Sequence, residues 1–170
     1  MALELTSPAF SNEGEIPTPY TCDGETRSHT PTLYTHDQED RSPALNWSGL
    51  PAGTKSLTLI MAESDNTASA RTACVHWILY DLRPHATGLT EAAKPQDLPA
   101  GSREGLNDWK HVRYDGPCSP IERRRYLFEL YALDTTLPDL NWPTRGQLER
   151  AMQGHVLEQV SLAGTYRRHP

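Results

Sequence analysis

The chain has 170 residues, 36% of them hydrophobic, and its formal net charge is −6 from 16 basic and 22 acidic side chains. This length predicts a single domain, 1–170, that buries roughly two-thirds of its unfolded surface. The acidic balance disfavours general nucleic-acid binding, which usually needs a basic field over the whole domain. With 14 Pro, 11 Gly and few long helical patterns, we expect many short strands joined by turns.

The three cysteines are Cys22, Cys74 and Cys118, and none lies in a C-x-x-C pair. An odd number without that spacing argues against a disulfide framework and against a structural zinc site. The N-terminus has no basic, apolar signal sequence, and no stretch approaches the ~20 apolar residues of a membrane span. We therefore expect a cytoplasmic protein with reduced thiols and no membrane span.

In chain order, residues 3–7 alternate and predict a short strand, and residues 11–31 form a turn-rich loop. A polar insertion at about 26–41 follows and contains His29, His36 and Asp37. These three side chains are metal-ligand types, but no helical or finger-like spacing fixes them, so we expect a solvated loop and no metal. Whether the insertion covers a site or mediates dimerisation stays open.

Two strong strands are predicted at residues 55–63 and 73–82. In the first, the apolar face ends in Glu63, and Asp65 follows in the next loop. In the second, alternation places His76 on the face of Ile78 and Tyr80. Polar side chains therefore stand where apolar segments meet loops.

A rigid loop at residues 115–120 contains Gly116 and two prolines, and a third strand follows it. In that strand Arg124 and Tyr126 share a face with Phe128 and Leu130. This arrangement brings a cation and a phenol to the rim of a pocket.

Near the C-terminus, Thr144 and Gln147 have the spacing of a capping box that opens a short helix. The helix presents Leu148 and Met152 on one face, and Gly154 suits its end. A final strand is expected at residues 162–166.

Several of these segments together resemble the phosphatidylethanolamine-binding protein family, and most closely its bacterial YbhB/YbcL, Raf-kinase-inhibitor-like branch. The segments 116–120, 125–126 and 130–134 resemble the family's GPCPP, (H)RY and LYALD signatures. Further matches are residues 16–24, 42–51, 76–77, 105–109, 154–157 and 162–166. Two departures stand out: Arg124 replaces the family's His, and Glu63 with Asp65 matches only part of its DPDAP motif.

The resemblance implies an antiparallel, Greek-key-type β-sandwich with a few short helices, one of them near the C-terminus. It also implies a pocket for phosphoethanolamine-like head groups or phosphorylated residues, in a protein that regulates or inhibits kinases or proteases. No cofactor is expected. The candidate ligand-binding residues are Glu63, Asp65, His76, Gly116, Pro117, Arg124 and Tyr126.

The chemistry of these residues independently suits a small phosphorylated or anionic ligand. Arg124, a protonatable His76 and the Tyr126 hydroxyl are hydrogen-bond donors, and convergent donors around an apolar floor favour phosphate or carboxylate. The carboxylates could orient His76 or accept from a ligand amine. Because Arg stays charged, this pocket should hold anions with less pH dependence than one with a second His.

Two alternatives belong to other classes. A hydrolase would use Cys118 or Ser119 as nucleophile with His76 and Asp65, but the loop has no nucleophile elbow, so we expect no enzyme. A protein–protein inhibitor would act through the insertion at 26–41 and would survive the loss of Arg124. A homodimer also stays open, since no exposed apolar stripe identifies its surface.

Overall fold

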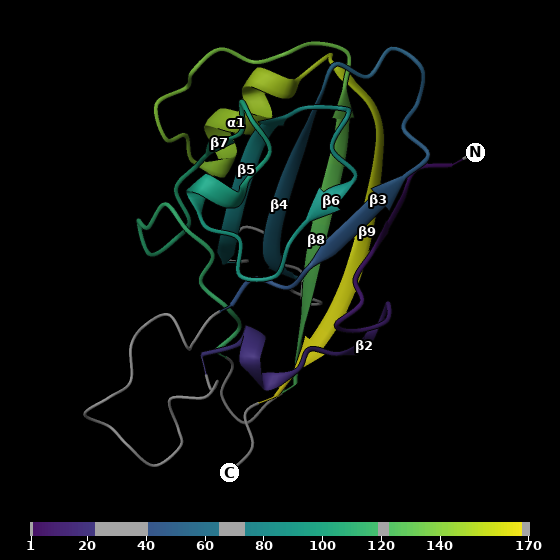
Figure 1. Cartoon of the computed structure of the whole chain (residues 1–170). Helices are drawn as coiled ribbons and strands as arrows, with labels where there is room; N and C mark the ends of the chain where they lie inside the picture. Colours follow the sequence, from purple (N-terminus) through teal and green to yellow (C-terminus); the bar gives the residue numbers. More distant parts are fainter. Residues whose placement is uncertain (1, 23–40, 65–73, 119–122, 168–170) are drawn as a thin grey trace.

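The computed structural model describes residues 2–22, 41–64, 74–118 and 123–167, and in these parts the chain forms two β-sheets (Figure 1). The smaller sheet has the order β1 (Glu4–Thr6), β3 (Leu45–Ser48), β6 (Gly88–Leu89). The larger sheet has the order β2 (Gly14–Glu15), β9 (Val156–Tyr166), β8 (Arg124–Leu133), β4 (Ser56–Ser64), β5 (Val75–Leu82), β7 (Arg103–Glu104). Neighbouring strands pair antiparallel, except β2 with β9.

The larger sheet is covered on both faces. On one face its side chains pack against the smaller sheet, which contributes Leu5, Leu45 and Trp47 to a common core. On the other face they pack against the helix α1 (Arg145–Met152), which contributes Leu148 and Met152. Strands β4 and β5 are buried almost throughout because they lie between these two layers. The predicted mainly β fold with a helix near the C-terminus is confirmed.

The helix begins as its sequence predicted. The Thr144 hydroxyl accepts from the Gln147 N–H, and the Gln147 side chain accepts from the Thr144 N–H, which completes the capping box. Gly154, just beyond the helix, has φ +84°, a left-handed conformation that glycine adopts without strain. In the described parts of the chain there are also two short 3₁₀ turns, η1 (Thr18–Tyr20) and η5 (Pro95–Asp97).

Antiparallel pairing brings one end of each central strand to the same end of the larger sheet. The end of β4, the start of β5 and the start of β8 meet there, because Glu63 pairs with Tyr126 and Ala62 with Val75. This end of the sheet lies at the lower end of the molecule in Figure 1, beside η1 and β2. The candidate site therefore lies at one end of the sheet.

Candidate functional site

A β-bulge in β5 directs His76 into the site. Met61 of β4 pairs with Trp77 and the next residue, Ala62, pairs with Val75, so His76 is the extra residue on β5. A bulge of this kind breaks the alternation of faces. His76 therefore contacts Tyr126, which belongs to the core between the sheets, whereas Ile78 belongs to the core under α1. The prediction that His76 shares a face with Ile78 and Tyr80 is wrong for this reason.

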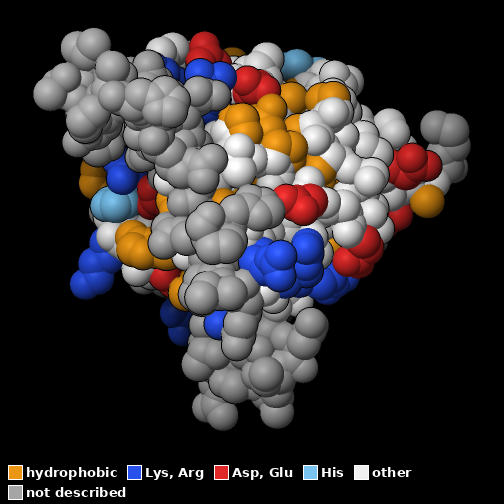
Figure 2. Space-filling model, turned by 90° about the horizontal axis from the view of Figure 1, so that it is seen from below, with side chains coloured by type: hydrophobic (Ala, Val, Ile, Leu, Met, Phe, Trp, Pro, Cys, Tyr) orange, Lys and Arg blue, Asp and Glu red, His pale blue; other side chains and the backbone are white. Residues whose placement is uncertain are grey.

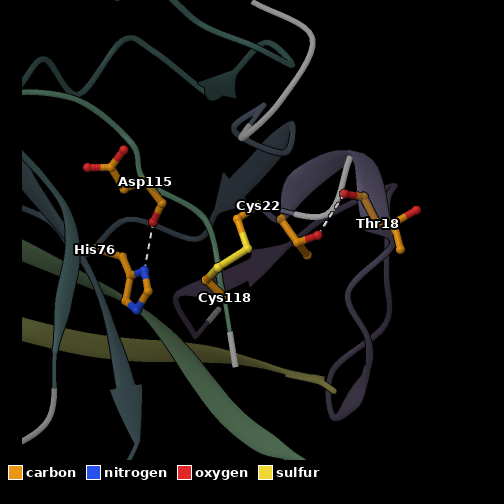
Figure 3. Close-up of a disulfide and its surroundings, with 6 residues drawn as sticks. Thr18, Cys22, His76, Asp115 and Cys118 are labelled. Atoms are coloured by element: carbon orange, nitrogen blue, oxygen red, sulfur yellow. Dashed lines mark hydrogen bonds between the residues drawn. A yellow bond between two sulfur atoms is a disulfide. The ribbon is translucent and has the colours of Figure 1, made fainter. Parts of the chain in front are cut away.

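The His76 ring is held between two aromatic side chains and a backbone carbonyl. Its centroid lies 5.3 Å from that of Tyr126 and 4.9 Å from that of Trp109, both edge to face. The carbonyl of Asp115 accepts a hydrogen bond from Nδ1 at 2.6 Å, as drawn in Figure 3. Since a carbonyl can only accept, the Nδ1 proton is fixed and Nε2 is the nitrogen that titrates.

Burial controls the protonation of this histidine. His76 is 2% exposed, and burial lowers its pKa below the ordinary value, opposed by the bond to the Asp115 carbonyl and by nearby carboxylates such as Glu63. An anion beside Nε2 would favour the imidazolium again.

Asn107 shapes the site loop, by which we mean residues 105–118. Its Oδ1 accepts from the N–H groups of Trp109 and His111, each at 3.0 Å. Its Nδ2 donates to the His76 carbonyl at 3.3 Å and to the Asp115 carboxylate at 2.7 Å. One buried amide thus fixes the loop to β5 and sets the place of Trp109.

The rim of the site carries an ion pair. Arg124 Nη1 lies 2.9 Å from Glu63 Oε1, and the two side chains are 39% and 20% exposed. Strand pairing explains the contact, because Glu63 lies opposite Tyr126 and Arg124 shares a face with Tyr126. Arg124 therefore lies at the rim of the site, as its sequence position predicted. Its charge is partly neutralised by Glu63, which was also predicted to bind ligand.

Figure 2 views this end of the molecule from below, and basic side chains there adjoin acidic ones. Such mixing is consistent with the pairing of the arginines at the start of β8. Arg125 makes two bonds to Glu13, at 3.0 and 2.7 Å.

The structure brings most of the predicted site residues together. Glu63, His76, Arg124 and Tyr126 form connected contacts. Gly116 and Pro117 are buried in the site loop, directly after the Asp115 carbonyl that holds His76. Asp65, Ser119 and most of the insertion predicted at about 26–41, including His29, His36 and Asp37, lie outside the described residues.

The expectation of three reduced thiols is wrong. Cys22 and Cys118, 96 residues apart in sequence, form a disulfide, and only Cys74 is free. Figure 3 shows this bond between the chain around η1 and the end of the site loop. The pairing could not be found by spacing rules, because such rules detect short, repeated intervals between cysteines.

Sequence reasoning also missed two residues that shape the site. Trp109 is 45% exposed although its ring packs on His76, and an aromatic directly after Asn-Asp was its only signal. Tyr114 packs edge to face on Trp77 and donates its hydroxyl to the Tyr20 carbonyl at 2.7 Å. No sequence signal distinguished it from an ordinary loop tyrosine.

A hollow lies on the other side of the larger sheet, between α1 and the strands β8 and β9. Its volume is about 410 Å³. It is lined by Tyr131, Gly146, Glu149, Arg150, Met152, Gln153 and Val156. None of the predicted site residues takes part in it, and the sequence patterns gave no sign of it.

The fold and the site define a class of protein: a two-sheet β-protein whose polar site lies at the end of the larger sheet. The site has a buried floor of His76 and Tyr126 and a partly exposed rim of Trp109, Glu63 and Arg124. Such a gradient from an apolar floor to a few polar groups is typical of small-ligand sites.

The chain belongs to the phosphatidylethanolamine-binding protein family, whose model matches residues 6–167. A UPF0098 protein of Methanothermobacter thermautotrophicus is 39% identical over 98% of this chain and 99% of the relative. The crystal structure of a putative phosphatidylethanolamine-binding protein homolog from Chlamydia trachomatis is 36% identical, with a TM-score of 0.82 over 99% of both chains. The structure of Escherichia coli YbcL is 20% identical with a TM-score of 0.81, which shows a shared fold.

Two further observations apply only to the described parts of the chain. No helix in them is long and apolar enough to cross a membrane. Within the same residues, no group of three or more His, Cys, Asp or Glu side chains is placed to hold a metal ion.

Proposed function

We propose that the chain binds a small phosphorylated or anionic ligand at the site formed by His76, Tyr126 and the site loop. The observation that carries the proposal is the fixed orientation of His76, whose Nδ1 is bonded to the Asp115 carbonyl at 2.6 Å. With that proton fixed, protonation at Nε2 turns a neutral ring into a charged donor. A phosphate group offers the negative charge that such a donor favours.

A phosphoethanolamine-like head group fits the same site. The Glu63 carboxylate at the rim could accept from its ammonium group, and Trp109 offers an aromatic face for a cation. Family membership supports this ligand class, because the family is described by its binding of phosphatidylethanolamine. A regulatory or inhibitory role toward a kinase or protease is the corresponding proposal for a protein partner.

We propose binding rather than catalysis. Cys118, one nucleophile of the hydrolase alternative, is joined to Cys22 and has no thiolate to offer while that bond is intact. The other components of that alternative, Ser119 and Asp65, lie outside the described residues. A cytoplasmic location stays a prediction, and the disulfide is an argument against it because such bonds are rare in the cytosol.

The test is a titration of the His76 imidazole by NMR with sulfate, an anion that keeps its charge near neutral pH. Because burial lowers the pKa of His76, the ring of the ligand-free protein loses its proton at a lower pH than an ordinary histidine does. Sulfate should raise that pKa and bind more tightly in acid, and affinity should fall as pH rises through the pKa of His76. The proposal assigns a hydrogen bond from the Tyr126 hydroxyl to the ligand, so in Tyr126→Phe the affinity should drop roughly three- to tenfold.

The matched control is His155→Gln. His155 is bonded to Asp134 at 2.8 Å, beyond the opposite end of β8, so its loss should leave sulfate binding unchanged. A His76 pKa that does not respond to sulfate, phosphate or phosphoethanolamine would contradict the proposed function. Turnover of a phosphate or carboxylate ester that depends on His76 would contradict the choice of binding over catalysis.

A further inference from the structure

The site loop lies between β7 and β8, and the disulfide connects it to a distant part of the chain near the N-terminus. We name residues 16–22, which contain η1, the N-terminal arm. The Cys22–Cys118 bond joins the arm to the end of the site loop. Two hydrogen bonds act beside it: the Cys22 N–H donates to the Pro117 carbonyl at 3.0 Å, and the Tyr114 hydroxyl donates to the Tyr20 carbonyl at 2.7 Å.

The opposite side of the site loop is attached to His76. The Asp115 carbonyl accepts from His76 Nδ1, and the Asp115 N–H donates to the His76 carbonyl at 3.2 Å. Only Gly116 and Pro117 separate Asp115 from the bridged Cys118. Figure 3 shows His76 on one side of this short segment and Cys22 on the other. The arm thus holds in place the carbonyl that orients His76.

The bridge lies at the surface of the molecule. As whole residues, Cys118 is exposed and Cys22 is partly exposed, so a dithiol in solution can approach the bridge. We propose that Cys22–Cys118 is a redox modification site and that its reduction by a dithiol weakens anion binding at His76. This inference rests on the proposed function, since it concerns regulation of the same site.

The exchange needs one dithiol for each bridge. A thiolate of the reductant attacks the Sγ of exposed Cys118, the S–S bond breaks, and Cys22 leaves as a thiolate that takes a proton from solvent. The second thiol of the reductant then attacks the mixed disulfide and releases Cys118. Two electrons pass to the protein, and the reductant ends as a disulfide. Free Cys74 is a less reactive thiol, because burial and the charges of Glu63 and Asp108 raise its pKa.

Reduction removes the covalent link and leaves the hydrogen bonds and the strands. The pairing of β4, β5 and β8 does not involve either bridged cysteine, so His76 and Tyr126 keep their places. The segment from Asp115 to Pro117 gains freedom, and a ligand that contacts it must order it again. Ordering costs of this kind correspond to a loss of affinity of roughly three- to tenfold.

The test compares phosphate binding by the oxidised protein and by the protein reduced with dithiothreitol. The two states are checked by counting free thiols, with Cys74 alone expected in the oxidised state and all three cysteines in the reduced state. The dissociation constant for inorganic phosphate, read from the His76 imidazole signals, should rise on reduction. In Cys22→Ser/Cys118→Ser it should equal the value of the reduced protein and ignore the reductant, whereas Cys74→Ser should respond as the parent does. Equal affinities in both redox states of the parent protein would overturn the proposal.

A second measurement without ligand separates this inference from the proposed function. Reduction should shift the His76 ring signals and speed amide hydrogen exchange at Asp115 and Gly116. If the oxidised protein binds none of sulfate, phosphate and phosphoethanolamine but these signals respond, the proposed function fails and the coupling between bridge and site stands. If they do not respond, the redox inference fails whatever the binding result.

Discussion

The ion pair between Arg124 and Glu63 changes what can be expected of the Arg124 charge. Its sequence position suggested a free, permanently charged anchor for an anion, in place of the family's histidine. In the structure its guanidinium bonds to Glu63 at 2.9 Å. The carboxylate lowers the net positive charge at the rim, so under the proposed function the ion pair should weaken the attraction of the site for anions.

Neutralising Glu63 should therefore strengthen anion binding. In Glu63→Gln the amide keeps the shape of the side chain, while the Arg124 guanidinium loses the negative charge of the Glu63 carboxylate. We expect sulfate affinity to rise roughly three- to tenfold at low ionic strength and to approach the parent value as salt screens the charge. The change in unfolding free energy should stay below about 1 kcal/mol, as for other partly exposed ion pairs. Calorimetric titration at two salt concentrations measures both effects.

Glu13→Gln is the matched control for Glu63→Gln. It removes the same charge from the partner of the next arginine, Arg125, whose side chain points to the opposite face of β8. Because net charge changes equally, a similar gain in both variants would mean that overall charge, and not the rim pair, controls binding. A gain confined to Glu63→Gln assigns the effect to Arg124.

At the scale of elements, close packing between β9 and the N-terminal segment gives a sharp test. Gly164 of β9 lies against Ile16 and Phe10, and an added Cβ would stand 2.5 Å from Ile16 Cγ1 and 2.9 Å from Phe10 Cε2. Gly164→Ala should lower the unfolding free energy by about 1–3 kcal/mol, the usual effect of overpacking a core. Urea denaturation at constant pH measures it.

Gly146→Ala is the control for this substitution. Gly146 lies in the first turn of α1, and an added Cβ would meet no atom within 4 Å. Alanine favours helix over glycine by up to about 1 kcal/mol, so this variant should be equally or more stable. If Gly164→Ala is as stable as Gly146→Ala, the close contact between Gly164 and Ile16 does not constrain the fold.

Elements with strong patterns could be predicted from the sequence, and details of pairing could not. β4, β5 and β8 carry long apolar runs because both faces of the sheet are buried. The bulge at His76 follows from the register between β4 and β5, and no Gly or Pro marks it. β9 begins at Val156, six residues before the predicted start. The prediction missed the first half of this strand because that half is mostly exposed and has no apolar face.

The same distinction applies to the site. His76, Tyr126, Arg124 and Glu63 could be predicted because each stands where an apolar strand meets a loop. Trp109 and the Cys22–Cys118 bond depend on how distant segments pack, and a single sequence carries no direct record of such contacts.

For the whole molecule, the disulfide is a constraint on the unfolded chain. It joins positions 96 residues apart, and the enclosed segment includes β3, β4, β5, β6 and β7. In the chain-entropy account a cross-link over a loop of this length destabilises the unfolded state by about 4.7 kcal/mol, much of a typical domain's stability. Cys22→Ser/Cys118→Ser should lose about that much unfolding free energy, and the parent protein should lose the same amount in dithiothreitol.

The comparison uses urea denaturation of five samples: Cys22→Ser/Cys118→Ser, and the parent protein and Cys74→Ser, each oxidised and reduced. Cys74→Ser removes a thiol that takes no part in the bridge, so it should keep the full difference between the two states. The slope of the transition should also increase on reduction, because an unlinked chain exposes more surface when it unfolds. If the oxidised and reduced parent have the same unfolding free energy, which is the product of the transition slope and the midpoint, the bridge contributes no stability, and its effect is limited to the site loop and the orientation of His76.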